Sequence, residues 1–125
     1  MSKKFYITTP IYYPSAKPHM GHAYSSIIAD FFARFKRMDG FDVQFITGTD
    51  EHGLKIQRAS EKKNIDPLEF CNQISQTFRD LSQTLNLTNT DFIRTTEDRH
   101  KKSVQHLWSE LFKNDDIYLS KYSGW

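Results

Sequence analysis

The alternation of short β-rich runs with helix-length segments is the feature of this sequence that most limits its fold. The run Phe5–Thr9 alternates bulky and β-branched side chains, and Pro10 ends it. Two further β-rich runs occupy residues 42–47 and 91–94. Because strands joined by helical crossovers pair in parallel with right-handed connections, we expect an α/β fold, with a parallel sheet flanked by helices.

The segment after the first β-rich run has the periodicity of an amphipathic helix. This helix is predicted to carry Pro18 in its first turn and to stop at Gly40. Its apolar face is formed by residues at three- and four-residue spacing, namely Tyr24, Ile27, Ile28, Phe31, Phe35 and Met38. A second, charged helix is predicted over residues 54–63.

Two helices with capping signatures follow. Asp66 is a typical N-cap before a helix whose apolar stripe is Cys71, Ile74, Phe78, Leu81 and Leu85. Thr95 and Asp98 have the spacing of a capping box before a last helix with Val104, Leu107, Trp108 and Leu111 on its apolar face. Residues 117–122 (IYLSKY) are predicted to form a final strand.

Composition limits the class of protein. The net charge is only +2, so we interpret the basic clusters at 61–63 and 99–102 as solvated helix faces rather than as a nucleic-acid footprint. The lone Cys71 forms neither an internal disulfide nor a Cys-x-x-Cys metal site. No apolar run approaches the roughly 18 residues of a membrane span, and residues 1–10 lack the apolar block of a signal peptide. We therefore expect one soluble, cytoplasmic domain with no membrane partner.

Two histidines frame a glycine where the first helix is predicted to begin. His19 and His22 stand three residues apart, so both lie in the first turn, where free backbone N–H groups and the helix dipole attract an anion. Gly21 removes a side chain between them and lets a flat group such as a purine approach the backbone. The pattern favours a nucleotide triphosphate site. A transition-metal site and an ordinary polar helix start are the alternatives.

Further candidate binding residues lie in the loops after the first two β-rich runs, at the carboxyl edge where open parallel sheets bind ligands. Asp50, Glu51 and His52 form either a solvated turn or a polar site, in which Asp50 would hold a positively charged group such as an α-ammonium. Tyr12 and Tyr13 could both pack on the sheet, but at least one must face outward and is available as the wall of a binding site.

Three stretches of the sequence resemble one protein family. They are TTPIYYPSAKPHMGHAYSSIIADFFARFKRMDG at 8–40, FITGTDEHG at 45–53 and DFIRTTEDRHKKSVQ at 91–105. They are similar to the amino-terminal part of methionyl-tRNA synthetases, which are class I aminoacyl-tRNA synthetases, and the resemblance spans essentially the whole chain. The His-x-Gly-His motif alone indicates only ATP-dependent adenylyl chemistry, whereas the longer blocks favour methionine over leucine, isoleucine, valine or cysteine.

The resemblance implies a reaction in two steps. Methionine attacks the α-phosphate of ATP, bound with Mg²⁺, to give methionyl-adenylate and pyrophosphate, and the methionyl group then passes to tRNA(Met). Such catalysis depends on positioning and on hydrogen-bond donors rather than on a covalent enzyme intermediate. By the resemblance, His19 and His22 are catalytic, His19, Gly21 and His22 bind ATP, and Ile11, Tyr13 and Asp50 bind methionine; Tyr12, Lys17, Glu51 and His52 are further candidates.

The resemblance also implies parts that this sequence does not contain. The family's second ATP-binding loop, Lys-Met-Ser-Lys-Ser, does not occur in it. We therefore expect residues 1–125 to be the N-terminal half of the catalytic domain, the first half of a Rossmann-like sheet that ends near the connective-domain insertion. The zinc that the family often binds would lie outside this chain.

Such a half-domain should be inactive in methionyl-adenylate synthesis on its own and should self-associate through uncovered apolar surface. The alternative function is a non-catalytic, synthetase-like module that binds a nucleotide or a protein partner.

Overall fold

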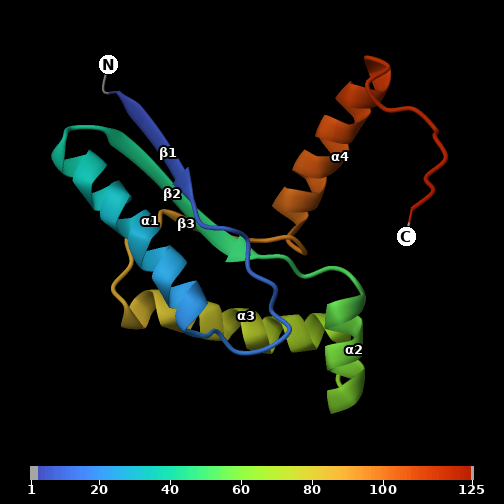
Figure 1. Ribbon diagram of the computed structural model, residues 1–125, viewed down its shortest axis with the longest axis horizontal. Helices are drawn as coiled ribbons and strands as arrows, with labels where there is room; N and C mark the ends of the chain where they lie inside the picture. The colour runs from blue at the N-terminus through green and yellow to red at the C-terminus, as the bar shows by residue number, and fades with distance from the viewer. Residues whose placement is uncertain (1–2, 125) are drawn as a thin grey trace.

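The computed structural model describes residues 3–124 as a parallel sheet with four helices (Figure 1). The elements are β1 (Lys4–Thr8), α1 (Met20–Met38), β2 (Asp42–Thr49), α2 (Leu54–Lys63), α3 (Pro67–Thr84), β3 (Asp91–Arg94) and α4 (Asp98–Lys113). The strand order is β1-β2-β3, and both pairings are parallel. The predicted α/β fold is therefore confirmed.

α1 packs on the sheet through small side chains rather than through its large apolar ones. Ala29 and Ala33 lie in one core cluster with Val43 and Phe45 of β2. Alanines on the helix leave room for the larger strand residues, so the two elements interdigitate closely. The large residues of the predicted apolar face, from Tyr24 to Met38, are all at least 40% exposed. The helix is amphipathic as predicted, but this face points away from the described core.

A second core cluster joins the loop after β1 to α2, α3 and β3. It consists of Tyr12, Ile56, Phe70, Cys71, Ile74, Phe78 and Phe92. The apolar stripe predicted for α3 is confirmed at Cys71, Ile74 and Phe78, which are buried. The predicted N-cap of α3 is confirmed too, since the Asp66 carboxylate accepts the amides of Leu68 (2.9 Å) and Glu69 (3.1 Å).

Two predictions about the last third of the chain are wrong. Residues 117–122 form no strand, because no strand of the described residues lies beside them to complete a ladder. The N-cap of α4 is Glu97 rather than Thr95. The Thr95 hydroxyl instead accepts a hydrogen bond of 2.8 Å from the backbone amide of Glu51, a residue distant in sequence.

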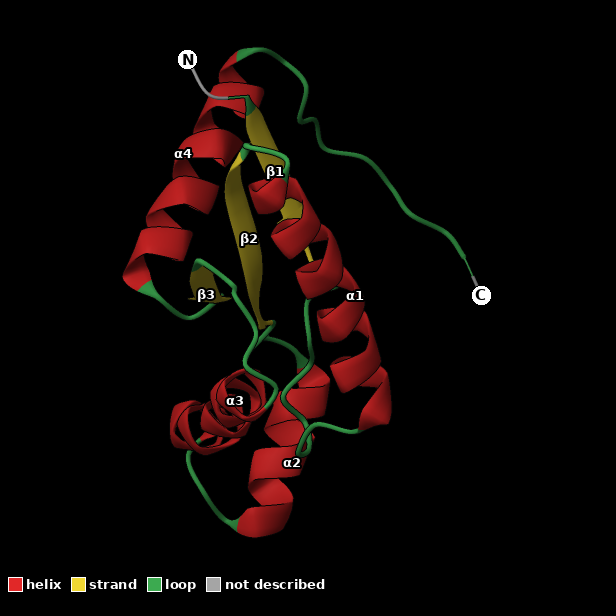
Figure 2. Cartoon of the chain, turned by 90° about the vertical axis from the view of Figure 1, so that its left-hand side faces the viewer, coloured by secondary structure: helices red, strands yellow, loops and turns green. Residues whose placement is uncertain are grey.

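α4 stands apart from both clusters. It lies on the side of the sheet opposite α1 (Figure 2), and none of its residues is buried. Within residues 3–124, no helix is long and apolar enough to cross a membrane. The cytoplasmic location stays a prediction.

The exposed apolar faces of α1 and α4 predict that the chain self-associates, because large uncovered apolar patches drive association. Phe31 is 64% and Trp108 60% exposed. We expect the mass measured by light scattering after gel filtration to rise with protein concentration. The double variant Phe31→Gln, Trp108→Gln should shift the mass toward that of a monomer, whereas Lys102→Gln should not. A monomeric mass at every concentration would contradict this prediction.

Candidate functional site

The two predicted binding loops lie side by side beyond the carboxyl ends of β1 and β2. The amide of Tyr12 donates to the carbonyl of Gly48 (3.1 Å), and the amide of Asp50 donates to the carbonyl of Tyr12 (2.8 Å). These bonds extend the parallel pairing by one bridge, between Tyr12 and Thr49. The backbone that leads to the histidines is therefore fixed to the backbone that carries Asp50.

The two adjacent tyrosines have different environments. The ring of Tyr12 is stacked on Phe78, with centroids 5.5 Å apart, and its hydroxyl lies 2.9 Å from Oγ of Ser26 in α1. The same ring makes a T-shaped contact with the ring of His22, with centroids 4.9 Å apart. Tyr13 is 51% exposed. Tyr12 thus anchors the first turn of α1 to the core, and Tyr13 is the tyrosine that faces outward, as the sequence predicted for one of the pair.

The two histidines form a reciprocal cap at the start of α1. The His19 Nδ1 accepts the amide of Gly21 (3.0 Å), and the His22 Nδ1 accepts the amide of His19 (3.0 Å). Pro18 therefore lies outside the helix rather than in its first turn, because His19 is the N-cap and the helix begins at Met20. The cap satisfies two backbone donors that a helix start leaves free.

This cap determines the tautomer of both rings. A ring nitrogen that accepts a hydrogen bond carries no proton, so a neutral ring then holds its proton on Nε2. Burial, and to a lesser extent the neighbouring His19, lower the pKa of His22 and favour this neutral form. Within residues 3–124 neither Nε2 has a protein partner, and the ring centroids are 3.9 Å apart. Two N–H donors are therefore available side by side at the helix N-terminus.

The cap also gives Gly21 a structural role. A Cβ at this position would lie 2.9 Å from Cε1 and 3.1 Å from Nδ1 of the His19 ring. A side chain there would push that ring out of its capping position. The sequence suggested that the glycine makes room for a bound purine, and the structure adds that it makes room for the histidine itself.

Most of the predicted site residues surround one hollow of about 530 Å³. This histidine hollow, as we call it, is within the size range of small-molecule sites. Its lining includes Ile11, Tyr12, Tyr13, Lys17, His19, Gly21 and His22. Asp50, Glu51 and His52 do not line it, although the backbone amide of Asp50 is hydrogen-bonded to the carbonyl of Tyr12.

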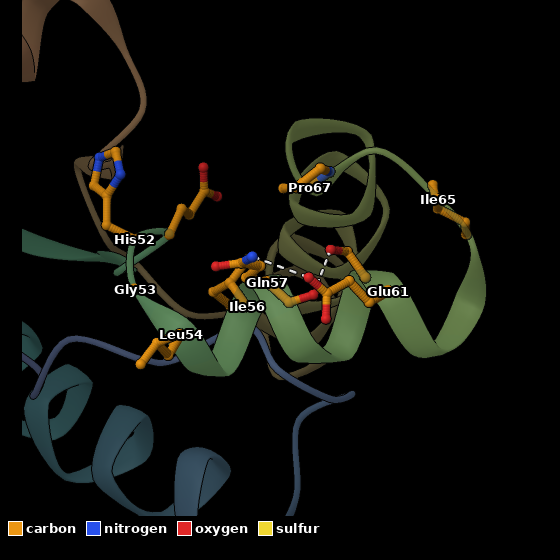
Figure 3. A pocket seen from close by; sticks show the side chains of 10 residues that line it. His52, Gly53, Leu54, Ile56, Gln57, Glu61, Ile65 and Pro67 are labelled. Atoms are coloured by element: carbon orange, nitrogen blue, oxygen red, sulfur yellow. Dashed lines mark hydrogen bonds between the residues drawn. The ribbon is translucent and has the colours of Figure 1, made fainter.

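Glu51 and His52 border a different hollow, of about 670 Å³, between the start of α2 and the start of α3 (Figure 3). There the side-chain amide of Gln57 donates a hydrogen bond of 2.9 Å to the carboxylate of Glu61. His52 Nε2 lies 3.3 Å from the carbonyl of Thr95. Among residues 3–124, no three histidine, cysteine, aspartate or glutamate side chains are close enough together to hold a metal ion, here or at the histidine pair.

The carboxylate of Glu51 is fully buried and is held by the protein's own donors. It accepts hydrogen bonds from Arg94 Nε (2.7 Å), Thr49 Oγ1 (2.9 Å), Ser75 and Thr96. Burial alone would raise the pKa of Glu51, but the Arg94 guanidinium and the three hydroxyls outweigh it and lower the pKa. The glutamate therefore stays ionised and ties the loop after β2 to α3 and the end of β3. Its partners lie 24 to 45 residues away in sequence, except Thr49, so no local pattern reveals this role.

Comparison with known proteins gives one consistent family. The model of class I (M) tRNA synthetases matches residues 5–125. The chain is 54% identical to a mitochondrial methionine–tRNA ligase of Takifugu rubripes over 99% of its own length and 21% of that protein's. It is also 54% identical to the methionine–tRNA ligase of Rickettsia conorii, over 100% of this chain and 25% of that one.

A solved structure has the same fold. Methionyl-tRNA synthetase of Mycobacterium tuberculosis, in complex with methionyl-adenylate, matches with a TM-score of 0.92 and 44% identity. The match covers 98% of this chain and 24% of that one. The chain thus spans about a quarter or less of the length of these relatives.

The lowered pKa of His22 predicts that stability falls in mildly acidic solution. The unfolded chain, with histidine near its ordinary pKa of 6.5, binds a proton more readily than the folded one. Stability should therefore decrease as the pH falls from about 6.5 toward the lowered pKa of His22. The measurement is urea unfolding at several pH values for the wild type and His22→Asn, which has no imidazole. A difference between the two curves that does not change with pH would contradict the prediction.

The buried ion pair predicts a large loss of stability in Glu51→Gln. The substitution keeps the shape but leaves the Arg94 guanidinium, whose side chain is 19% exposed, without its counter-charge. We expect the free energy of unfolding in urea to fall by about 3 to 5 kcal/mol, and Glu51→Gln with Arg94→Gln to lose less than the two single losses together. The matched control is Glu110→Gln, which removes an exposed pair with Lys113 and should cost about 1 kcal/mol at most. Equal losses in Glu51→Gln and Glu110→Gln would refute the assignment.

Proposed function

The chain belongs to the family of class I (M) tRNA synthetases, and from this premise we propose that it carries the ATP motif and part of the methionine pocket of a methionine–tRNA ligase. The enzyme would activate methionine as methionyl-adenylate and transfer it to tRNA(Met). Residues 1–125 would belong to its catalytic domain. One observation carries the proposal: within residues 3–124 the Nε2 atoms of His19 and His22 have no protein partner, and the two rings lie 3.9 Å apart at the N-terminus of α1.

Both donors would bind the phosphates of ATP. As the methionine carboxylate attacks the α-phosphate, negative charge on the phosphate oxygens increases and pyrophosphate leaves. N–H donors that are already in place meet that charge without reorganising, and comparable donors contribute about 2.7 to 4 kcal/mol to transition-state stabilisation. The positive end of the α1 dipole acts in the same direction. Lys17, on the wall of the same hollow, supplies a further positive charge.

ATP would bind as its Mg²⁺ complex. The ion is part of the substrate and neutralises charge on the phosphates. In the proposed reaction the residues of this chain bind and orient the nucleotide, and none forms a covalent bond with it.

Methionine would bind next to the nucleotide, at the rim of the hollow. Ile11 and Tyr13 are both about half exposed there, and Ile11 also borders an apolar groove of about 310 Å³ at the end of the sheet. A thioether gains from contact with an aromatic ring. Asp50, whose backbone amide is hydrogen-bonded to the carbonyl of Tyr12, would accept a hydrogen bond from the α-ammonium group of methionine. The Mycobacterium tuberculosis relative, which was solved in complex with methionyl-adenylate, supports the binding of methionine and nucleotide by this fold.

The roles of the remaining candidates differ. Tyr12 would act by positioning His22 rather than by touching a ligand, and Glu51 by positioning the loop of Asp50. His52 borders the other hollow, and we propose no reaction step for it.

The test separates the role of His19 as a hydrogen-bond donor through Nε2 from its role as the cap of α1. Asparagine is among the best N-cap residues, so His19→Asn keeps an acceptor for the Gly21 amide but removes the Nε2 donor. We expect unchanged or higher thermal stability and an ATP affinity lowered roughly tenfold or more, measured by calorimetry or by amide shifts in NMR spectra. His106→Asn, the same exchange at an exposed position of α4, should leave the affinity unchanged. Equal ATP affinities for His19→Asn and the wild type, or no detectable binding by the wild type, would refute the proposal.

A further inference from the structure

Lys55 of α2 contacts the ring of Tyr13 in the loop after β1. Its Nζ lies 5.5 Å from the centre of that ring, within the range of a cation–π interaction. The backbone of Tyr13 stands between the buried side chains of Tyr12 and Pro14, whereas the Tyr13 side chain is half exposed. Among residues 3–124, it takes part in no ring–ring contact, and the side-chain hydrogen bonds of the tyrosine pair come from Tyr12. The orientation of the Tyr13 ring therefore depends on Lys55.

The fold brings Lys55 to this ring from the second binding loop. Gly53 has a positive φ of 99°, a conformation that glycine adopts without strain, and it lets the chain turn directly into α2. The side chain of Ile56 is buried in the same core cluster as Tyr12. Lys55 and Tyr13 are the exposed neighbours of this buried pair, so they meet where α2 packs against the loop. In Figure 1 the blue loop after β1 runs down toward α2.

The stability of α2 does not account for a lysine at position 55. Lys55 stands in the first turn, where the helix dipole disfavours a cation, and that turn contains no acidic residue. None of the ion pairs among residues 3–124 includes Lys55. The face of an aromatic ring carries negative potential, so the ring of Tyr13 provides the favourable contact for this ammonium group.

The contact lies at the border of the histidine hollow. Tyr13 lines that hollow, and Ser15 lines both it and a neighbouring hollow of about 400 Å³. Lys55 borders only the neighbouring hollow. The ammonium group thus reaches the Tyr13 ring from outside the histidine hollow and does not occupy the space of a ligand.

We propose that Lys55 is a positioning residue, whose ammonium group fixes the ring of Tyr13 as a wall of the histidine hollow. A ring that is held by a cation on one face has its other face free for a thioether. The contact also joins the two binding loops on their outer side, as the backbone bond between Asp50 and Tyr12 joins them beside the sheet. The inference rests on the proposed function for the identity of the ligand as methionine, but not for the position of the ring.

The first experiment follows the Tyr13 ring by NMR in the ligand-free chain. Lys55→Met keeps the aliphatic stem without the charge, Lys55→Arg keeps a cation that stacks on aromatic rings, and Lys62→Met removes the same charge elsewhere on α2. We expect the χ1 couplings of Tyr13 to shift toward a rotamer average in Lys55→Met. They should keep their wild-type values in Lys55→Arg and Lys62→Met. Circular dichroism checks that all three variants are folded.

The second experiment measures affinity for L-methionine and for methioninol, in which a hydroxymethyl group replaces the carboxylate. An exposed cation–π contact changes an equilibrium by about two- to fivefold. Lys55→Met should therefore weaken the binding of both ligands by about that factor, because the wall of the hollow is no longer held in place. Lys55→Arg and Lys62→Met should bind both ligands as the wild type does.

Three results would overturn the proposal. Unchanged Tyr13 couplings in Lys55→Met would show that the ring is held in another way. The same change in Lys62→Met would show a diffuse effect of charge. Weaker binding of methionine but not of methioninol by Lys55→Met would show that Lys55 contacts the ligand's carboxylate directly. A wild type that binds neither ligand, with the Tyr13 couplings changed in Lys55→Met as expected, would refute the proposed function alone.

Discussion

Tyr12 is fixed from three directions, and the geometry of the histidine pair depends on it. Its backbone continues the pairing with β2, its ring stacks on Phe78 of α3, and its hydroxyl bonds to Ser26 of α1. A single buried side chain thus joins the sheet to the two helices at the point where the polypeptide leaves β1. Because His22 packs against the same ring, the donors of the site are positioned by the core rather than by the loop alone.

The loop after β2 is supported in a different way. Glu51 provides a buried charge whose four donors come from β2, α3, β3 and the turn that follows it. The neighbouring Asp50 is thereby held beside Tyr12, with its backbone amide hydrogen-bonded to the carbonyl of that residue. In both loops a buried residue makes the structural contacts, and the residue next to it is more exposed. This separation suits a site that acts by positioning.

Periodicity and turn residues are local signals, so the sequence allowed the succession of strands and helices up to α4 and the parallel sheet to be predicted. It also allowed us to predict that the loop with the two histidines lies beside the loop after β2. It did not reveal which side of α1 is buried. A period of 3.6 residues identifies an apolar face, but whether alanines or phenylalanines contact the sheet depends on how closely the helix approaches Val43 and Phe45. Thr95 was misassigned for a similar reason, since its partner Glu51 lies 44 residues away. The His-x-Gly-His spacing indicated an anion site, yet the mutual capping of the rings follows only from their geometry.

That mutual capping ties the protonation of the two imidazoles to the helix start. Each Nδ1 lone pair accepts a backbone amide, so a proton taken up there would break a cap hydrogen bond, while the backbone bonds from the amides of His22 and Ala23 to the carbonyl of His19 would remain. A proton on Nδ1 and an intact cap therefore exclude each other. The pair works as a rigid surface of donors, and any anion that accepts both Nε2–H groups makes the beginning of α1 harder to unwind.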